Sequence, residues 1–173
     1  MQKVAIVTGG AKGIGYGSVL RLLEDGAHVT AFDRDTAALS QAEKDFAPFA
    51  KNFSAVNVDI SSDSAVSAAI KVVGDRFGYI NYLVNSAGIQ TYGTAEDTSE
   101  EIWDNTFAVN VKAMYLTAKY AIPFMRVAKS GSIVNISSVQ SLSNQKNVLA
   151  YAASKGAVNA LTRSIAIDYA ADQ

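Results

Sequence analysis

The sequence lacks cysteine and has only one histidine and two prolines, and the first two shortages each remove a kind of chemistry. Without cysteine the chain forms no disulfide and offers no thiolate as a nucleophile or metal ligand. The single histidine, His28, has no cluster of histidines and carboxylates around it, which argues against a metal site built by the protein. We therefore predict no metal, and we interpret His28 and Trp103 as packing residues.

An excess of one charge is also lacking. The 15 Lys and Arg residues against 16 Asp and Glu give a formal net charge of -1, which provides no basic field for nucleic acid. No apolar run approaches the roughly 20 residues that a bilayer crossing needs. No signal peptide is visible at the N-terminus. These absences predict a cytoplasmic protein without nucleic-acid or membrane partners.

What the sequence does contain is a regular alternation of short apolar runs and longer helical runs. The continuous apolar run at 4–8 is typical of a strand buried on both faces. The strands predicted in this way cover residues 4–8, 27–33, 53–59, 79–88 and 131–137. The helices predicted between and after them cover residues 13–26, 36–49, 61–78, a long region from Thr98, and 149–167. This order predicts an α/β fold with a doubly wound parallel sheet between two layers of helices.

The long helical region from Thr98 carries three local signals. Thr98 with Glu101 three residues later has the spacing of a capping box. Pro123 is expected to bend the region or to mark its later boundary. Asn110 is a poor helix former among apolar neighbours, and a buried amide needs hydrogen-bond partners. Asn110 could distort the helix, hold a water molecule in a proton relay, or simply be solvated.

A glycine-rich loop, TGGAKGIG at residues 8–15, lies between the first predicted strand and the first predicted helix. Its glycines allow a tight turn and a close approach to a pyrophosphate, while the helix N-terminus presents free amides to the anion. The strand–turn–helix context favours a dinucleotide site over a turn without a ligand. The loop residues predicted to contact the cofactor are Gly9, Lys12, Gly13, Ile14 and Gly15.

An acidic residue, Asp33, closes the second predicted strand. Its carboxylate could accept hydrogen bonds from a ribose diol and would repel a 2'-phosphate, which favours NAD over NADP. Lys12 and Arg34 could each reach a 2'-phosphate, so NADP is not excluded. The alternative for Asp33 is a helix N-cap.

Two further segments complete the predicted cofactor site. Asp59 ends the third predicted strand and either contacts the adenine or caps the helix that opens at Ser61. The segment after the fourth strand lies at the same rim of the sheet, where ligands of open α/β sheets bind. The residues included from these two segments are Asp59, Ile60, Asn85, Ala87 and Gly88.

A tyrosine and a lysine, Tyr151 and Lys155, stand four positions apart on one face of the last predicted helix. A free tyrosine has a pKa of about 10, too high for efficient proton exchange near neutrality, and a nearby ammonium favours the phenolate form. Ser138 lies 13 residues before Tyr151, just past the end of the fifth predicted strand. Its hydroxyl could hold a substrate oxygen beside the phenol, or it could cap a turn.

Together these pieces resemble the short-chain dehydrogenase/reductase family of the T-G-x-x-x-G-x-G and Tyr-x-x-x-Lys type. The matching residues, in family order, are 8–15, Asp33, Asp59, 85–88, Asn110, Ser138, Tyr151 and Lys155. The resemblance implies that residues 1–173 form a single NAD(P)-binding Rossmann-type domain. It implies that Tyr151 is the acid/base and that Ser138 orients the substrate oxygen. It also implies that Lys155 supports the phenolate and binds ribose, and that Asn110 takes part in a water-mediated relay.

The implied reaction is the interconversion of a secondary alcohol and a ketone, with hydride transfer to or from NAD(P). The segment between Ser138 and Tyr151 is rich in amides, which favours a small polar substrate such as a sugar or polyol. The residues predicted to bind substrate are Ser138, Gln140, Asn147 and Tyr151. A 3-oxoacyl thioester reductase and a hydroxysteroid-type dehydrogenase are alternatives, and a non-catalytic dinucleotide-binding protein is an alternative of another class.

The resemblance also bears on assembly and on length. Members of the family commonly pair through the last helix of this chain and the helix before it. Small residues on that last helix would allow such packing, so we expect a homodimer or homotetramer; they are Ala152, Ala153, Gly156, Ala157 and Ala160. Family members continue beyond this helix with another strand, a substrate-covering loop and a last strand. We therefore expect a domain that is incomplete at its C-terminus.

We expect a chain that ends at Gln173 to keep the adenine half of the cofactor site but to show little turnover. The missing segments would complete the substrate pocket. A steady-state assay that follows the absorbance of reduced nicotinamide checks this expectation, and robust turnover by the 173-residue chain would contradict it.

Overall fold

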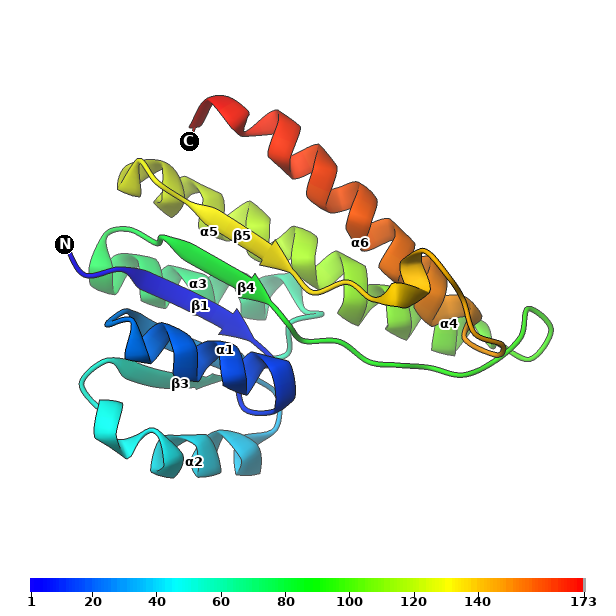
Figure 1. Ribbon diagram of the computed structural model, residues 1–173, viewed down its shortest axis with the longest axis horizontal. Coiled ribbons are helices and arrows are strands. Elements are labelled where there is room, and N and C mark those ends of the chain that lie inside the picture. Colours follow the sequence, from blue (N-terminus) through cyan, green and yellow to red (C-terminus); the bar gives the residue numbers. More distant parts are fainter. Residues whose placement is uncertain (173) are drawn as a thin grey trace.

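A five-stranded sheet, in the order β3-β2-β1-β4-β5, forms the centre of the computed structural model, which describes residues 1–172 (Figure 1). All four strand pairings are parallel. The strands are β1 Val4–Thr8, β2 His28–Asp33, β3 Phe53–Asn57, β4 Tyr82–Asn85 and β5 Ser132–Asn135. Each lies inside a predicted strand, and β1, which is buried along its whole length, shows the continuous apolar run of a strand covered on both faces.

Helices cover both faces of this sheet. They are α1 Gly13–Glu24, α2 Thr36–Asp45, α3 Asp63–Phe77, α4 Glu100–Phe107, α5 Ala113–Ala128 and α6 Leu149–Asp168. Alternate side chains of β1 enter two separate cores. Val4 and Ile6 pack with residues of α3 and α5, whereas Ala5 and Val7 pack with residues of α1 and α2. This arrangement confirms the predicted doubly wound fold.

The order of the strands reverses next to β1. The chain moves outward from β1 to β3 and then returns to the other side of β1 with β4. The register pairs Thr8 with Phe32 of β2 and with Asn85 of β4, so the carboxyl ends of these strands are level. Ligands of open α/β sheets bind in the crevice at such a reversal. The N-terminus of the chain and the C-terminal end of α6 lie at the other end of the sheet, away from this crevice (Figure 1).

In the long helical region the predicted N-cap is wrong, and one of the two alternatives for Pro123 is excluded. The N-cap of α4 is Ser99, whose hydroxyl accepts the backbone N–H of Ile102, and not Thr98. The Thr98 hydroxyl is already engaged, since it donates to the carbonyl of Thr94 at 2.6 Å. Pro123 does not mark a helix boundary, because it lies inside α5, next to the buried residue Ile122.

Strand β5 forms one edge of the sheet. Beside it, a hollow of about 290 Å³ lies between β5, α5 and α6, and none of the predicted site residues lines it. Its apolar walls include Ile122, Met125, Ile133, Ile165 and Tyr169.

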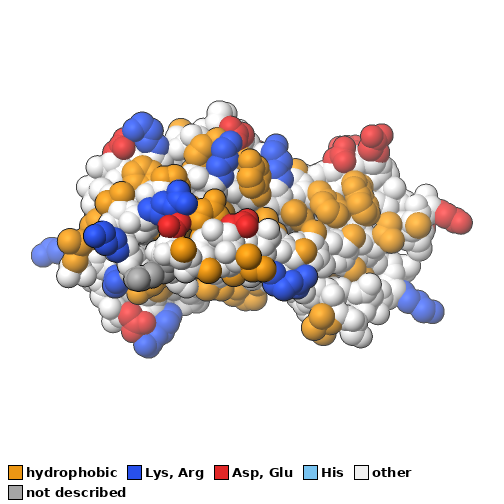
Figure 2. Space-filling view, turned by 90° about the horizontal axis from the view of Figure 1, so that it is seen from above, with side chains coloured by type: hydrophobic (Ala, Val, Ile, Leu, Met, Phe, Trp, Pro, Cys, Tyr) orange, Lys and Arg blue, Asp and Glu red, His pale blue; other side chains and the backbone are white. Residues whose placement is uncertain are grey.

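The surface on the α6 side mixes hydrophobic side chains with charges of both signs (Figure 2). Within residues 1–172, none of the helices combines the length and the hydropathy that a bilayer crossing requires. On α6 the small residues divide between the interior and the surface, with Ala152 buried and Ala153 and Ala160 exposed. The homo-oligomer stays a prediction.

Two helical glycines provide a test of the packing between α3 and α5. A Cβ at Gly74 would overlap the ring of Phe124, whereas a Cβ at Gly17 would meet no atom within 4 Å. We expect Gly74→Ala to lower the free energy of unfolding by about 1–3 kcal/mol through overpacking. Gly17→Ala, the matched control, should raise it by about 0.5–1 kcal/mol because alanine favours the helix. Urea unfolding at unchanged m-value checks both variants, and equal stability of the two would contradict the packing described here.

Candidate active site

A hollow of about 320 Å³ opens at the edge of the sheet where β1, β2 and β4 end. It lies at the reversal of strand order, where the fold places ligands. The predicted cofactor residues that line it are Gly9, Lys12, Ile14, Asp33, Arg34, Asp59, Ile60, Ala87 and Gly88. The remaining residues of its walls are Phe32, Val58, Ser86, Ile89 and Val109.

Gly9 lies where the loop after β1 meets the segment after β4. Its φ is +64°, and a Cβ built on it would lie 2.8 Å from the Cα of Ala87, so only glycine fits. Its N–H donates to the carbonyl of Phe32 at 2.8 Å, and the N–H of Ala87 donates to the hydroxyl of Thr8 at 3.2 Å. The loop is thus fixed to β2 on one side and to the segment after β4 on the other.

The N-terminus of α1 follows directly from this loop. Helix α1 begins at Gly13 after an N-cap, Lys12, whose side chain makes no capping hydrogen bond. The amides of the first turn are therefore left without a side-chain acceptor, as an anion site requires. Gly13 and Gly15 do not line the hollow, and their predicted contribution to cofactor binding is through the shape of this turn.

Asp33 does not cap the following helix. The N-cap of α2 is Asp35, whose Oδ1 accepts the N–H of Ala38 at 2.9 Å. The Asp33 carboxylate instead accepts the N–H of Ala11 at 3.3 Å and that of Asp35 at 3.1 Å. These two bonds hold the half-buried carboxylate at the wall of the hollow, in the position predicted for a ribose partner.

Asp59 closes a turn and also lines the hollow. Its Oδ1 accepts both the N–H and the hydroxyl of Ser61, at 2.9 and 2.7 Å. These bonds, and the nearby charge of Arg34, hold the pKa of Asp59 below its ordinary value. The N-cap of α3 is Ser62, so the alternative that Asp59 caps this helix is wrong. The contact with adenine stays a prediction.

Asn110 lies in a π-helical turn, Ala108–Lys112, between α4 and α5, and it is fully buried. Its Oδ1 accepts the N–H of Ile89 at 2.8 Å, and its Nδ2 donates to the carbonyl of Ile89 at 2.9 Å and to the hydroxyl of Ser154 at 3.0 Å. The predicted distortion of the helix is confirmed, and the solvated alternative is wrong. Asn110 joins the segment after β4 to α6, and its role in a water relay stays a prediction.

Lys155 lies below the surface beside Tyr151. It is 5% exposed, its Nζ donates to the carbonyl of Ile136 at 2.7 Å, and its Nζ lies 5.7 Å from the centre of the Tyr151 ring. Burial lowers the pKa of Lys155 from its ordinary value. A Cβ at Gly88 would lie 3.7 Å from this Nζ and 3.3 Å from Oδ1 of Asn110. Gly88 therefore connects the hollow with the Tyr151–Lys155 pair.

Three of the predicted substrate residues make hydrogen bonds with loop residues. The Ser138 hydroxyl accepts the N–H of Gln140 at 3.2 Å, so its turn-capping role is present and its substrate role stays a prediction. Gln140 accepts the N–H of Gln145 at 2.8 Å. Asn147 has a φ of +61°, and its carbonyl accepts the N–H of Gly93 at 2.9 Å. This last bond fixes the loop before α6 to the loop after β4.

Asn85 does not line the hollow, although it was predicted to bind the cofactor. Its buried amide accepts from the hydroxyl of Thr117 at 2.8 Å and donates to Oδ1 of Asn135 at 2.8 Å. Asn135 in turn donates to the hydroxyl of Thr162 at 3.0 Å. The side chain of Asn85 thus links β4 to α5 and β5 rather than forming a wall of the hollow.

The family comparison agrees with this geometry. The family model for short chain dehydrogenases matches residues 3–173. The chain belongs to the short-chain dehydrogenase family. The predictions of the family and of an oxidoreductase are confirmed.

The relatives of this short-chain dehydrogenase include enzymes named as dehydrogenases of alcohols. It is 38% identical to 2-(R)-hydroxypropyl-CoM dehydrogenase of Xanthobacter autotrophicus over 98% of this chain and 70% of the relative. It superimposes with a TM-score of 0.93 on NAD+-bound xylitol dehydrogenase, at 30% identity, covering 99% of this chain and 66% of the other. It superimposes equally well on ElxO with NADP bound, at 31% identity, covering 99% and 70%. The chain spans about two thirds of the length of the curated relatives it matches.

Some contacts of this short-chain dehydrogenase were not predicted. Ser154 accepts from Asn110 and donates to the carbonyl of Tyr151 at 2.7 Å, although a serine inside a helix carries no distinctive signal. Lys155 donates to the backbone carbonyl of Ile136, and because every residue has such a carbonyl, the sequence does not indicate this acceptor. Asp35 was predictable in principle, since an Asp directly before a helical run is a strong N-cap signal.

Ser154 offers a test of the link between the π-helical turn and α6. We expect Ser154→Ala to lower the free energy of unfolding by about 1–3 kcal/mol, because it removes a hydrogen-bond partner from the buried Asn110 amide. Ser164→Ala, at an exposed position of the same helix, should stay within about 0.5 kcal/mol of the parent. Urea unfolding of both variants measures the difference. A Ser154→Ala variant as stable as the Ser164→Ala control would show that the link contributes nothing.

Proposed function

We propose that the protein is an oxidoreductase that interconverts a secondary alcohol and a ketone, with Tyr151 as the acid/base and NAD as the preferred cofactor. The observation that carries the proposal is the continuity of the hollow with the proton-transfer pair. Gly88 lines the hollow and lies against both Lys155 and Asn110. A ligand that fills the hollow would therefore end beside Tyr151.

The residues around the hollow fit a dinucleotide. The amides at the start of α1, which lack a side-chain acceptor, suit a pyrophosphate, and Gly9 lines the hollow without a side chain of its own. The Asp33 carboxylate suits the adenosine ribose, and Lys155 would bond the second ribose. The nicotinamide, when bound, supplies or accepts the hydride.

Tyr151 would move the proton. During oxidation its phenolate oxygen takes the proton of the substrate hydroxyl while the carbinol carbon gives up its hydride, and during reduction both transfers reverse. The Lys155 ammonium, 5.7 Å from the ring centre, stabilises the phenolate charge. The buried partners of Lys155 and Asn110 fix this geometry before any ligand arrives. Ser138 would hold the substrate oxygen beside the phenol.

For the substrate we favour a small hydroxylated molecule. The loop before α6 carries Gln140 and Asn147, and polar groups at a site fix polar ligands. One solved neighbour is named a xylitol dehydrogenase, and one relative is named a 2-(R)-hydroxypropyl-CoM dehydrogenase. Both of the substrates so named carry hydroxyl groups on short carbon chains. Preference for NAD rests on Asp33, which would repel a 2'-phosphate.

Replacement of the phenol hydroxyl separates chemistry from binding. We expect Tyr151→Phe in the full-length protein to reduce turnover by about 10²–10⁴-fold, because the proton acceptor is lost. The affinity for NADH should change less than about twofold, since the ring and Lys155 stay in place. Tyr115→Phe, at an exposed position on α5, is the control and should leave turnover unchanged. Steady-state kinetics and NADH fluorescence titration give the two readouts, and undiminished turnover in Tyr151→Phe would refute the assignment.

A further inference from the structure

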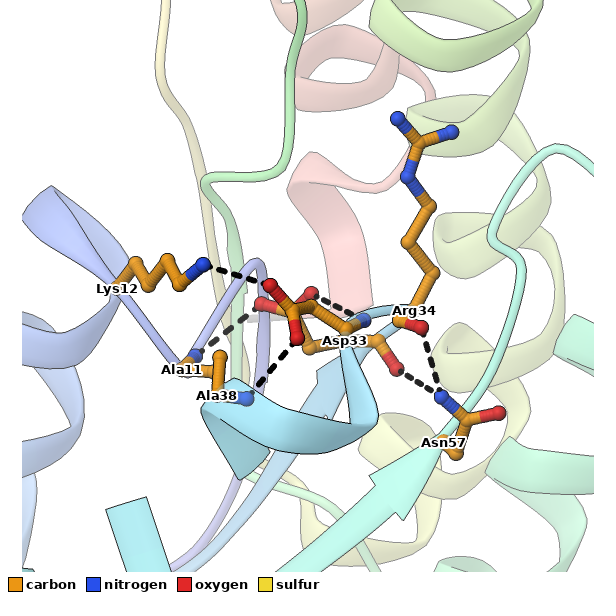
Figure 3. Close-up of polar contacts among 7 residues, drawn as sticks. Ala11, Lys12, Asp33, Arg34, Ala38 and Asn57 are labelled. Carbon is orange, nitrogen blue, oxygen red and sulfur yellow. Dashed lines mark hydrogen bonds and ion pairs between the residues drawn. The ribbon is translucent and has the colours of Figure 1, made fainter. Parts of the chain in front are cut away.

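An ion pair lies beside the carboxylate proposed to bind ribose. Nζ of Lys12, in the glycine loop, is 2.6 Å from Oδ2 of Asp35, the residue just past β2. Figure 3 shows the Lys12 side chain extending from its loop toward the acidic groups at the end of β2. Lys12 is one of the two cations that line this end of the hollow, the other being Arg34.

The second oxygen of Asp35 keeps this pair in place. Oδ1 accepts the N–H of Ala38 as the N-cap of α2, so the carboxylate is held while Oδ2 faces Lys12. The Lys12–Asp35 pair raises the pKa of Lys12 and lowers that of Asp35, so both groups stay ionised together. Asp33, whose carboxylate is fixed by two backbone N–H groups, adds a second negative charge nearby.

Arg34 is placed differently. Its guanidinium extends away from Asp33 and from Lys12 (Figure 3), and within residues 1–172 it makes no ion pair. Its backbone carbonyl, together with that of Asp33, accepts from the Asn57 amide at 3.0 Å and 3.2 Å. Of the two cations, only Lys12 is therefore held by a carboxylate beside Asp33.

We propose that Asp35 is a specificity-determining residue that withholds Lys12 from the 2'-phosphate of NADP. A phosphate monoester carries a charge of about −1.5 to −2 at neutral pH. Asp33, Asp35 and Lys12 together present a net negative charge at the end of β2, and a phosphate there would compete with the Asp35 carboxylate for Lys12. NAD, which has a hydroxyl at the 2' position, meets no such conflict. This inference rests on the dinucleotide function proposed above.

The test is a double-mutant cycle on cofactor binding. Asp35→Asn removes the charge and keeps a good N-cap, since asparagine and aspartate are equally favourable there. We expect Asp35→Asn to tighten NADPH binding by about five- to tenfold and to change NADH binding less than about twofold. Lys12→Ala should weaken NADPH binding less than about twofold in the parent, where Asp35 already holds the lysine. In the Asp35→Asn background the same change should abolish the whole gain.

Fluorescence titration with NADH and NADPH measures these affinities. Calorimetry with 5'-AMP and 2',5'-ADP isolates the added phosphate from the nicotinamide half. The gain in Asp35→Asn should shrink as salt rises, because it is electrostatic. An unfolding temperature of Asp35→Asn equal to that of the parent would show that the N-cap of α2 is kept.

Three results would overturn the inference. The first is an NADPH affinity that Asp35→Asn leaves unchanged. The second is a Lys12→Ala effect of equal size in the parent and in Asp35→Asn. The third is a gain in Asp35→Asn that survives Lys12→Ala but is lost in Arg34→Ala. In each of these cases NADH still binds, so only the inference about Asp35 fails. If the proposed function itself were wrong, the parent chain would bind neither NADH, NADPH, 5'-AMP nor 2',5'-ADP.

Discussion

The close contact between Gly9 and Ala87 is the constraint on which the rest of the site depends. It joins the loops that follow β1 and β4, the two strands at which the sheet order reverses. Because the register levels the ends of β1, β2 and β4, this contact forms the floor of the crevice, and the acidic end of β2 forms one wall. Ile14 at the start of α1 and Asp33 at the end of β2 then line the same hollow.

The second half of the site depends on buried hydrogen bonds instead of close packing. Asn110 bonds both backbone groups of Ile89 and the hydroxyl of Ser154, so one amide holds the segment after β4 against α6. Lys155 is fixed from the next turn of α6 by the carbonyl of Ile136. A buried polar network of this kind is costly when incomplete, which is why it holds one geometry. The hollow and the Tyr151–Lys155 pair meet at Gly88 as a result.

The features that sequence predicts well here are local. A continuous apolar run such as 4–8 predicts a buried strand, and a glycine loop between a strand and a helix predicts the tight turn and close backbone approach found at Gly9. Asn110 was a visible misfit in its helix, and the π-helical turn is the result. The failures come from competition for single groups: the Thr98 hydroxyl donates to the carbonyl of Thr94, so Ser99 caps α4, and the cap of α2, Asp35, was not predicted. Long-range acceptors such as the carbonyl of Ile136 have no side-chain signature to predict from.

A crystal structure of the chain with bound NAD+ tests the central claim most directly, that the crevice beside Gly9 and Asp33 is a dinucleotide site. The account predicts the adenosine ribose within about 3 Å of the Asp33 carboxylate, as hydrogen-bond geometry requires, and the pyrophosphate at the first turn of α1. It also predicts that the nicotinamide half approaches Tyr151 past Gly88. A dinucleotide bound in the apolar hollow between β5, α5 and α6, with the crevice at Gly9 left open, would contradict it.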